Sequence, residues 1–335
     1  MTRRPSVSLK TIAERAGVST ITASRALRGM PIVNEKTRRQ ITEIATSLGY
    51  VPNRIASSLR SQRSGLIALI VPTVAGSIFS ETVEAISRRL VAAGYQTIIG
   101  ESTYDIGQEQ AVLESLVQRR PDAIIIAGTN HTPATRTILE ALGIPVIEIW
   151  ELTDTPVDSV VGFSNFHAAY DFTRALIEKG YRRFAMASGP VEQENRASLR
   201  ADGHYKALAE AGIDPGAAIV IPHFLGILHS GQSLLAFVRD HPEIDCLFCT
   251  NELIAIGATV QCRRAGIDVP GDIAIVGFGD VEACSIIEPP LTTVHINGTE
   301  MGRNAAQLVL DRLGGRGAAG ARIDVRYAFR WRGTA

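Results

Sequence analysis

The stretch Leu9–Tyr50, LKTIAERAGVSTITASRALRGMPIVNEKTRRQITEIATSLGY, decides the fold of the amino-terminal part of the chain. Apolar residues recur at helical spacing in three short segments of it. Ser8, Ser19 and Asn34 precede these segments, and their side-chain oxygens can cap helix amino termini. Gly17 follows the first segment, at a position that often needs a positive φ. We therefore predict three short helices, the first two of which form a helix-turn-helix.

Each expected helix has an apolar inner face and a polar outer face. The inner residues are Ile12, Ala13 and Ala16 in the first helix, Ala23, Ala26 and Leu27 in the second, and Ile41, Ile44, Ala45 and Leu48 in the third. Any small helical bundle would show such inner faces. The polar outer side of the second helix is typical of a helix that lies in a DNA major groove. We expect DNA contacts from Ser19, Thr20, Ile21, Thr22, Ser24 and Arg25.

Charge is distributed unevenly along the chain. Residues 1–63 contain 12 lysines and arginines against three glutamates, which gives +9, and the rest carries −9 in a chain of zero net charge. A basic segment beside an acidic body is typical of nucleic-acid binding. The alternative is a solvated charged face, which the helix-turn-helix pattern inside the same segment disfavours.

Three segments of this region resemble a known family. TIAERAGVSTITASRAL, NEKTRRQI and GYVPNRIASSLR are similar, in this order and over about sixty residues, to the DNA-binding headpiece of the lactose-repressor family of bacterial regulators. We place the headpiece at residues 7–50 and a hinge helix with its linker at 51–64. So short a helix orders only when it packs against something, such as its twin in a dimer on DNA. The resemblance implies that Leu59 inserts into the minor groove, and Arg54 and Arg60 can reach phosphates. A flexible tether is the alternative.

Short apolar strands alternate with helices in the remainder, residues 65–335. The expected strands are LIALIVPT, QTIIGES, DAIIIAG, PVIEIW, SVVGFS, RFAMASG, AIVIP, CLFCT and IAIVGFG. Helices are expected at 79–93, 108–118, 133–142, 165–179, 196–211, 231–240, 251–265 and 298–313. This rhythm predicts an α/β body of two lobes, each with a doubly wound parallel sheet, as in periplasmic binding proteins. We expect lobe 1 at about 65–160 plus 292–315 and lobe 2 at about 161–290 plus 320–332.

Ligands of such sheets bind beyond the carboxyl ends of the strands, here in the crevice between the lobes. Each candidate residue by itself is typical of a helix cap or a surface group, but together the candidates converge on this crevice. The expected effector site comprises Ser77, Phe79, Asn130, His131, Phe163, Asn165, Arg200, Asn251 and Asp280. The family resemblance implies effector contacts for Arg200 and Asn251. Many members have an aspartate at the position of Gly279, and here Asp280 comes one residue later.

Some segments resemble one branch of the family, the gluconate-operon repressors. They are GYQTIIGESTYDIGQEQ, NHTP, VGFSNFHAA and FCTNELIAIGA. This resemblance implies an open-chain sugar acid as the effector. Arg200 and His131 can supply the positive charge for its carboxylate. Because arginine also binds neutral hydroxyl groups, a neutral or phosphorylated sugar is an alternative effector.

The motifs of catalysis are missing from the sequence. Cys246 and Cys249 lie in one expected strand, face opposite sides and have no second pair, so we interpret them as core cysteines. The sequence has no phosphate-binding loop with a lysine and no serine elbow. We therefore expect no enzyme activity, no catalytic residues, no metal and no cofactor.

The whole pattern predicts a transcriptional repressor of sugar-acid uptake and catabolism genes. A homodimer would bind operator DNA, and a small-molecule effector would close the lobes and release it, which is allosteric coupling. A corepressing effector is the alternative. The end FRWRGTA has no apolar heptads, which favours a dimer over a tetramer. The start MTRRPSVSLK has no signal core and no apolar run could span a membrane, so we expect a cytoplasmic protein acting at the bacterial nucleoid. A sugar-binding protein of a transport system is the alternative function.

Overall fold

The structure is a computed structural model that describes residues 7–27, 29–50, 63–74, 78–189, 195–221 and 227–335. The chain forms two compact units, Met1–Ser64 and Gly65–Ala335. The predicted fold class is confirmed, because the first unit contains the expected headpiece helices and the second is a two-lobed α/β body.

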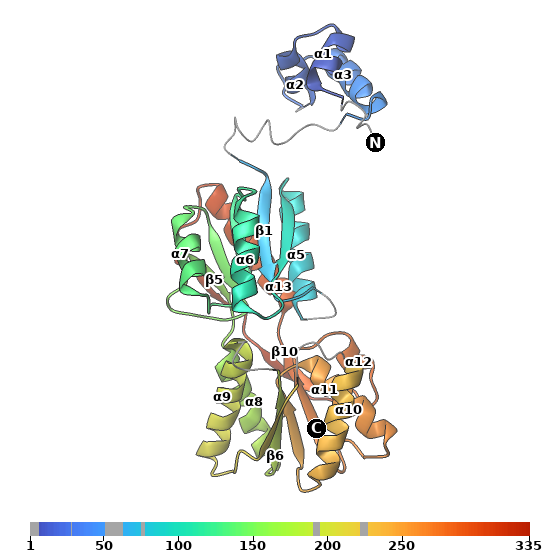
Figure 1. The fold of residues 1–335 in the computed structure, drawn as a ribbon, viewed down its shortest axis with the longest axis vertical. Helices are drawn as coiled ribbons and strands as arrows, with labels where there is room; N and C mark the ends of the chain where they lie inside the picture. The colour runs from blue at the N-terminus through green and yellow to red at the C-terminus, as the bar shows by residue number, and fades with distance from the viewer. Residues whose placement is uncertain (1–6, 28, 51–62, 75–77, 190–194, 222–226) are drawn as a thin grey trace. The chain divides into compact units, whose positions relative to one another are not determined.

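The first unit contains three helices in its described residues (Figure 1). They are α1 (Leu9–Ala16), α2 (Thr20–Leu27) and α3 (Glu35–Ser47). Their predicted apolar faces meet in one small core, in which Ile12, Ala23 and Ile41 are completely buried. Full burial of an isoleucine side chain is worth about 1.5–3 kcal/mol. So small a unit therefore depends on a few such side chains.

The predicted helix ends of this unit are confirmed. The side-chain oxygens of Ser8, Ser19 and Asn34 each accept a hydrogen bond from the backbone N–H three residues later, at 3.2, 3.1 and 2.8 Å. These bonds satisfy amides that have no partner within the helix. Gly17 follows α1 with a φ of 66°, a conformation that costs other residues energy. The chain can therefore turn sharply between α1 and α2.

Lobe 1 of the second unit is built on a six-stranded parallel sheet in its described residues. The spatial order is β2-β1-β3-β4-β5-β11. The strands are β1 (Leu66–Val71), β2 (Gln96–Glu101), β3 (Ala123–Ala127), β4 (Val146–Ile149), β5 (Ser159–Gly162) and β11 (Arg322–Asp324). Helices cover both faces, which explains why β1 and β3 are unbroken apolar runs. One face packs against α5 (Phe79–Ala92) and α13 (Gly298–Leu313), and the other against α6 (Ile106–Val117) and α7 (Pro133–Ala141).

Lobe 2 repeats this plan, with the order β7-β6-β8-β9-β10-β12 and an antiparallel last strand. Its strands are β6 (Phe184–Ser188), β7 (Ala217–Val220), β8 (Cys246–Cys249), β9 (Ala274–Phe278), β10 (Thr292–His295) and β12 (Ala328–Arg330). Its helices are α8 (Asn165–Glu178) and α9 (Asn195–Glu210) on one face, α10 (Ile227–Asp240) and α11 (Glu252–Arg264) on the other, and the short α12 (Ala283–Ile286) after β9. Cys246 and Cys249 are buried on opposite faces of this sheet, as predicted.

The structure differs from the predicted division of the lobes at three strands. β5, expected to begin lobe 2, pairs with β4 in lobe 1, and β11 pairs with β5 there. β10, expected in lobe 1, pairs with β9 in lobe 2. The cause is the connection at residues 150–158, which joins two neighbouring parallel strands without a helix. In the sequence, the break in the alternation of strands and helices suggests that a new lobe begins at β5.

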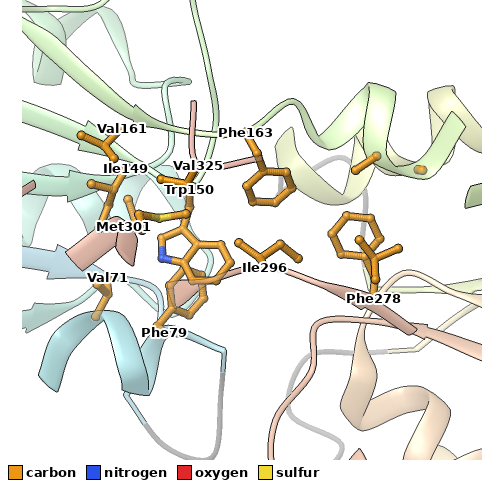
Figure 2. Packing of buried hydrophobic residues seen from close by; sticks show 14 of the residues in the cluster. Val71, Phe79, Ile149, Trp150, Val161, Phe163, Phe278, Ile296, Met301 and Val325 are labelled. Carbon is orange, nitrogen blue, oxygen red and sulfur yellow. The ribbon is translucent and has the colours of Figure 1, made fainter. Parts of the chain in front are cut away.

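The chain crosses between the lobes three times, after β5, after β10 and after β11 (Figure 1). Aromatic side chains fill the space beside these crossings (Figure 2). The ring centroids of Phe79 and Trp150 are 5.1 Å apart, those of Trp150 and Phe163 are 6.1 Å apart, and those of Phe163 and Phe278 are 6.2 Å apart. This row joins lobe 1 to lobe 2, so the hydrophobic core is continuous through the hinge.

Candidate functional site

The outer side of α2 presents an exposed row of side chains in the headpiece. Thr20, Ile21 and Arg25 are exposed, and the apolar side chain of Ile21 is 58% accessible. Thr22 and Ser24 are half-buried beside them. Such a surface can donate hydrogen bonds to base edges and can contact a thymine methyl group. Ser19 is exposed as well, but its hydroxyl caps α2.

Several predicted site residues lie outside the described residues. They are Arg54, Leu59 and Arg60 in the linker, and Ser77 after β1. Their predicted contacts with DNA and effector therefore stay predictions.

The strand orders place a ligand site between the lobes. In each sheet the order reverses at one point, between β1 and β3 in lobe 1 and between β6 and β8 in lobe 2. Connections at such a reversal run to opposite faces of the sheet, so a crevice opens at the carboxyl ends of the two strands. The predicted residues Phe79, Asn130, Phe163 and Asn251 all follow strand ends at this edge.

A small polar pocket occupies this crevice. Its volume is about 40 Å³. Lobe 1 contributes Pro72 after β1, Ser102 after β2 and Asn130 after β3, and lobe 2 contributes Asn195 and Arg196 at the start of α9. The pocket is therefore lined by both lobes, as an effector that controls the angle between them requires.

Arg200 lies beside this pocket but is bound within lobe 2. Its side chain is 4% exposed, its Nε donates to Asn165 Oδ1 at 2.7 Å, and its Nη1 donates to the carbonyl of Thr250 at 2.8 Å. The guanidinium also lies over the ring of Phe278, 4.2 Å from its centroid. A buried charge with such partners is fixed in place. Arg200 therefore orients Asn165 at the edge of the crevice.

Close helix packing holds Arg200 in this position. A Cβ atom at Gly203 would overlap the carbonyl oxygen of Phe166, so α8 and α9 touch backbone to backbone there. Asn165, the residue before Phe166, donates from Nδ2 to the carbonyl of Trp150 at 2.9 Å and to Glu151. Burial raises the pKa of the Glu151 carboxyl, although the bonds from Asn165 oppose this rise. Asn165 thus links lobe 2 to the end of β4.

The helix ends at the crevice differ in part from prediction. Asn251 caps α11, and its side chain accepts from the amides of Leu253 and Ile254 at 2.7 and 3.4 Å. Asn165 is not the cap of α8, because the Ser164 hydroxyl accepts from the amide three residues later. The Asn165 side chain is thereby available for the contacts between the lobes.

His131 does not supply a cation to the crevice in this structure, in contrast to expectation. Its ring is 1% exposed, with Nδ1 2.7 Å from Glu109 Oε1 and Nε2 3.4 Å from Glu148 Oε1. Burial alone would lower the pKa of His131, but these two carboxylates outweigh it and raise the pKa to about 9. The positive charge is therefore held inside lobe 1, between two glutamates.

Asp280 is also held by protein partners. Arg332 donates to both of its carboxylate oxygens, at 2.7 and 3.1 Å, and His295 lies 3.0 Å away. Burial alone would raise the pKa of Asp280, but His295 and Arg332 outweigh it and lower the pKa to about 2. Asp280 lines a second cavity of about 410 Å³, with Trp150 and Ile296 among its walls. This second cavity is mainly apolar and lies at the hinge.

Sequence reasoning missed Arg196 and Trp150 at the crevice. Arg196 is 6% exposed, and its Cζ lies 5.3 Å from the ring centroid of Phe79, across the crevice in lobe 1. The available signal was its spacing of four residues from Arg200, which places both side chains on one face of α9. Trp150 has a φ of 73°, unusual for an aromatic residue, and no local pattern indicated it.

The described residues contain no group of histidine, cysteine and acidic side chains arranged to hold a metal. Among the same residues, every helix is too short or too polar to cross a membrane.

A helix-turn-helix unit followed by a two-lobed α/β body with a crevice between the lobes defines a class of DNA-binding regulators that respond to small molecules. Residues 8–53 match the family of bacterial regulatory proteins, lacI family, and residues 64–330 match the periplasmic binding proteins and sugar binding domain of the LacI family. The chain belongs to the LacI family of bacterial transcriptional regulators.

Relatives of full length support this assignment. The regulator GntR of Escherichia coli is 32% identical over 95% of this chain and 96% of its own, and GntR of Pseudomonas aeruginosa is 33% identical over 97% and 94%. A LacI-family regulator from Silicibacter pomeroyi superimposes with a TM-score of 0.91 at 32% identity, over 98% of this chain and 99% of its own. A lac repressor dimer bound to operator and an anti-inducer has the same fold, with a TM-score of 0.83 at 24% identity, over 98% and 99%.

The chain is therefore a DNA-binding transcriptional regulator, and its relatives are regulators and not enzymes. Members of this family bind operator DNA and small-molecule effectors and form dimers. The resemblance inferred from the headpiece motifs is thus confirmed.

Proposed function

We propose that this protein is a repressor of genes for the uptake and breakdown of sugar acids, and that a gluconate-like acid releases it from its operator. It acts as a homodimer in the cytoplasm, on nucleoid DNA. The observation that carries the proposal is the polar pocket, which has residues of both lobes in its wall and a guanidinium group, that of Arg196, among them. The GntR relatives support the choice of effector class.

Operator reading is assigned to the exposed row on α2. Arg25 reads a guanine through two hydrogen bonds, and Thr20 and Ile21 contact neighbouring base edges. Ser19, Thr22 and Ser24 contact the DNA backbone or the groove wall beside them. In the linker, Arg54 and Arg60 contact phosphates and Leu59 inserts into the minor groove between base steps.

The effector is assigned to the crevice. Asn130 lines its polar pocket. Phe79 and Phe163 belong to the aromatic row beside it. Arg200, Asn165 and Asn251 form its lobe 2 side. Because these groups come from both lobes, an effector that binds all of them favours one angle between the lobes. This change in angle alters the spacing of the two headpieces in a dimer and weakens operator binding.

A ligand panel tests the proposal. The thermal stability of the full-length protein is measured with gluconate, other aldonates, the matching neutral sugars and sugar phosphates, because a ligand that binds only the folded state raises Tm. The active compounds are then titrated against an operator complex. We expect aldonates to raise Tm and to release the operator. Stabilisation by a neutral sugar or a sugar phosphate alone would refute the sugar-acid assignment and leave the regulator assignment intact.

A further inference from the structure

We infer that Arg196, and not Arg200 or His131, is the residue that recognises the acid group of the effector. This inference rests on the proposed function, because it assigns one residue a role at the same crevice. It starts from the positions of the three cationic side chains that lie near the strand ends there.

Two of these cations are engaged inside single lobes. The charge of His131 lies between Glu109 and Glu148 in lobe 1, and its ring is 1% exposed. Arg200 donates to Asn165 and to the carbonyl of Thr250 in lobe 2. Neither residue is part of the wall of the polar pocket, as far as the described residues define that wall. Both side chains therefore support the residues around the crevice and do not line the polar pocket.

Arg196 occupies a different position. It lies in the wall of the polar pocket, and its guanidinium extends from α9 of lobe 2 to lobe 1. There it lies over the ring of Phe79, and its Nη1 is 3.4 Å from the place that a Cβ atom on Gly128 would occupy. An anion bound to this guanidinium would also touch the strand ends of lobe 1. Binding would therefore hold the two lobes together.

The polar pocket has room for a small functional group. A water-sized group needs about 10–15 Å³ of such volume, and the pocket measures about 40 Å³. A carboxylate therefore fits in it. A planar guanidinium matches a carboxylate through two parallel hydrogen bonds, which a hydroxyl group cannot form.

The acidic residues in the same wall already have donors. Glu109 accepts from His131 at 2.7 Å. The Asp105 carboxylate caps α6 and accepts from the amides of Gly107 and Gln108 at 2.7 and 2.9 Å. The imidazolium offsets one of the two negative charges of Glu109 and Glu148, and the positive end of α6 stabilises the Asp105 carboxylate. Ser102 and Asn130 add neutral polar groups to the wall. Among the described residues, Arg196 is the cationic side chain of this wall, so it is the group that an anion would approach.

The test compares gluconate with gluconamide, in which a neutral amide replaces the carboxylate and every hydroxyl is retained. Dissociation constants are measured by calorimetry for the full-length wild type, Arg196→Met and Arg196→Lys. Wild type is expected to prefer gluconate by roughly 10- to 100-fold, as a charge-assisted pair provides. Arg196→Met should bind both compounds equally. Arg196→Lys should restore part of the preference, because lysine keeps the charge but not the planar fork.

Two further variants separate this role from structural effects. Arg264→Met removes an exposed arginine of the same lobe and should leave both dissociation constants unchanged. Arg200→Met should weaken both compounds by a similar factor, because it disturbs the position of Asn165 and not the charge at the pocket. Circular dichroism and Tm establish that each variant folds. If Arg196→Met is unfolded, the Arg196→Lys ratio alone decides.

The outcomes distinguish the two proposals. A preference for gluconate that persists in Arg196→Met would overturn the assignment of Arg196. If Arg196→Met weakens the binding of gluconate and gluconamide by the same factor, Arg196 binds hydroxyl groups or positions other residues. This result would also overturn the assignment of Arg196 to the acid group. Wild-type protein that binds no aldonate would instead refute the proposed function itself.

Discussion

The His131 cluster predicts an unusual pH dependence of stability. The pKa of His131 rises from 6.5 to about 9 in the folded protein. One pKa unit corresponds to about 1.4 kcal/mol, so this difference corresponds to about 3 kcal/mol of folding free energy. Because the folded pKa is the higher one, this contribution is fully present below pH 6.5 and is lost as the pH rises through 9. Stability should therefore fall by up to about 1.4 kcal/mol per pH unit within this range.

Tryptophan fluorescence during urea denaturation measures this effect in the body alone. The chain has two tryptophans, Trp150 and Trp331, and both belong to the second unit. The free energy of unfolding is determined from pH 6 to pH 10 at a fixed protein concentration, because dimerisation also contributes. His241→Gln is the matched control, since His241 is paired with Glu243 at the surface. It should show the same slope as the wild type.

Replacement of His131 by leucine should remove the slope. At pH 7 the variant leaves Glu109 and Glu148 buried without their cation, at a cost of about 3–5 kcal/mol. Because the variant has no imidazole at this position, its free energy of unfolding should not show the fall between pH 6.5 and 9. A wild-type free energy that stays constant between pH 6.5 and 9, or a variant with the wild-type slope, would show that the imidazole is neutral in the folded protein.

Three further predictions concern function. Arg25→Ala should weaken operator binding by about 1–3 kcal/mol and leave binding to random DNA largely unchanged in mobility-shift assays; an equal loss on both would mean that Arg25 contacts only phosphate. Leu59→Ala should reduce the bend of the operator, measured by energy transfer between labelled DNA ends, with the unfolding free energy of the protein unchanged; an unchanged bend removes Leu59 from the mechanism. Arg200→Ala should keep operator affinity but require at least about tenfold more aldonate for release, because Asn165 loses the donor that orients it; release at the wild-type concentration would exclude this role.

Local features of the fold were predictable from the sequence. Helices such as α5 and α8 end within a residue of their predicted bounds, because apolar periodicity and polar caps act between residues at most four positions apart. The partner of a strand is not local information. β5 and β11 join the same sheet although about 160 residues separate them, and no pattern within either strand specifies this pairing.

The same limit applies to the charged residues of the crevice. His131 follows a strand end, and the sequence alone suggests a side chain directed to the ligand. Its partners Glu109 and Glu148 lie 22 residues before it and 17 after it, and only the packing of α6 against the sheet brings them together. A buried imidazole between two carboxylates keeps its proton, so its charge stabilises lobe 1 and is withdrawn from the effector.

The two arginines of α9 have different roles at the crevice, because one is bound within lobe 2 and the other reaches lobe 1. Arg200 binds the carbonyl of Thr250 and so moves with lobe 2 as a rigid part of it. The guanidinium of Arg196, one turn earlier, lies over the ring of Phe79 in lobe 1. A change in the angle between the lobes therefore alters the surroundings of Arg196 while those of Arg200 stay constant. An anion that binds Arg196 and the strand ends of lobe 1 therefore binds more tightly at one angle between the lobes than at another. Because coupling is reciprocal, the same free energy by which this angle strengthens anion binding is the free energy by which the bound anion favours this angle.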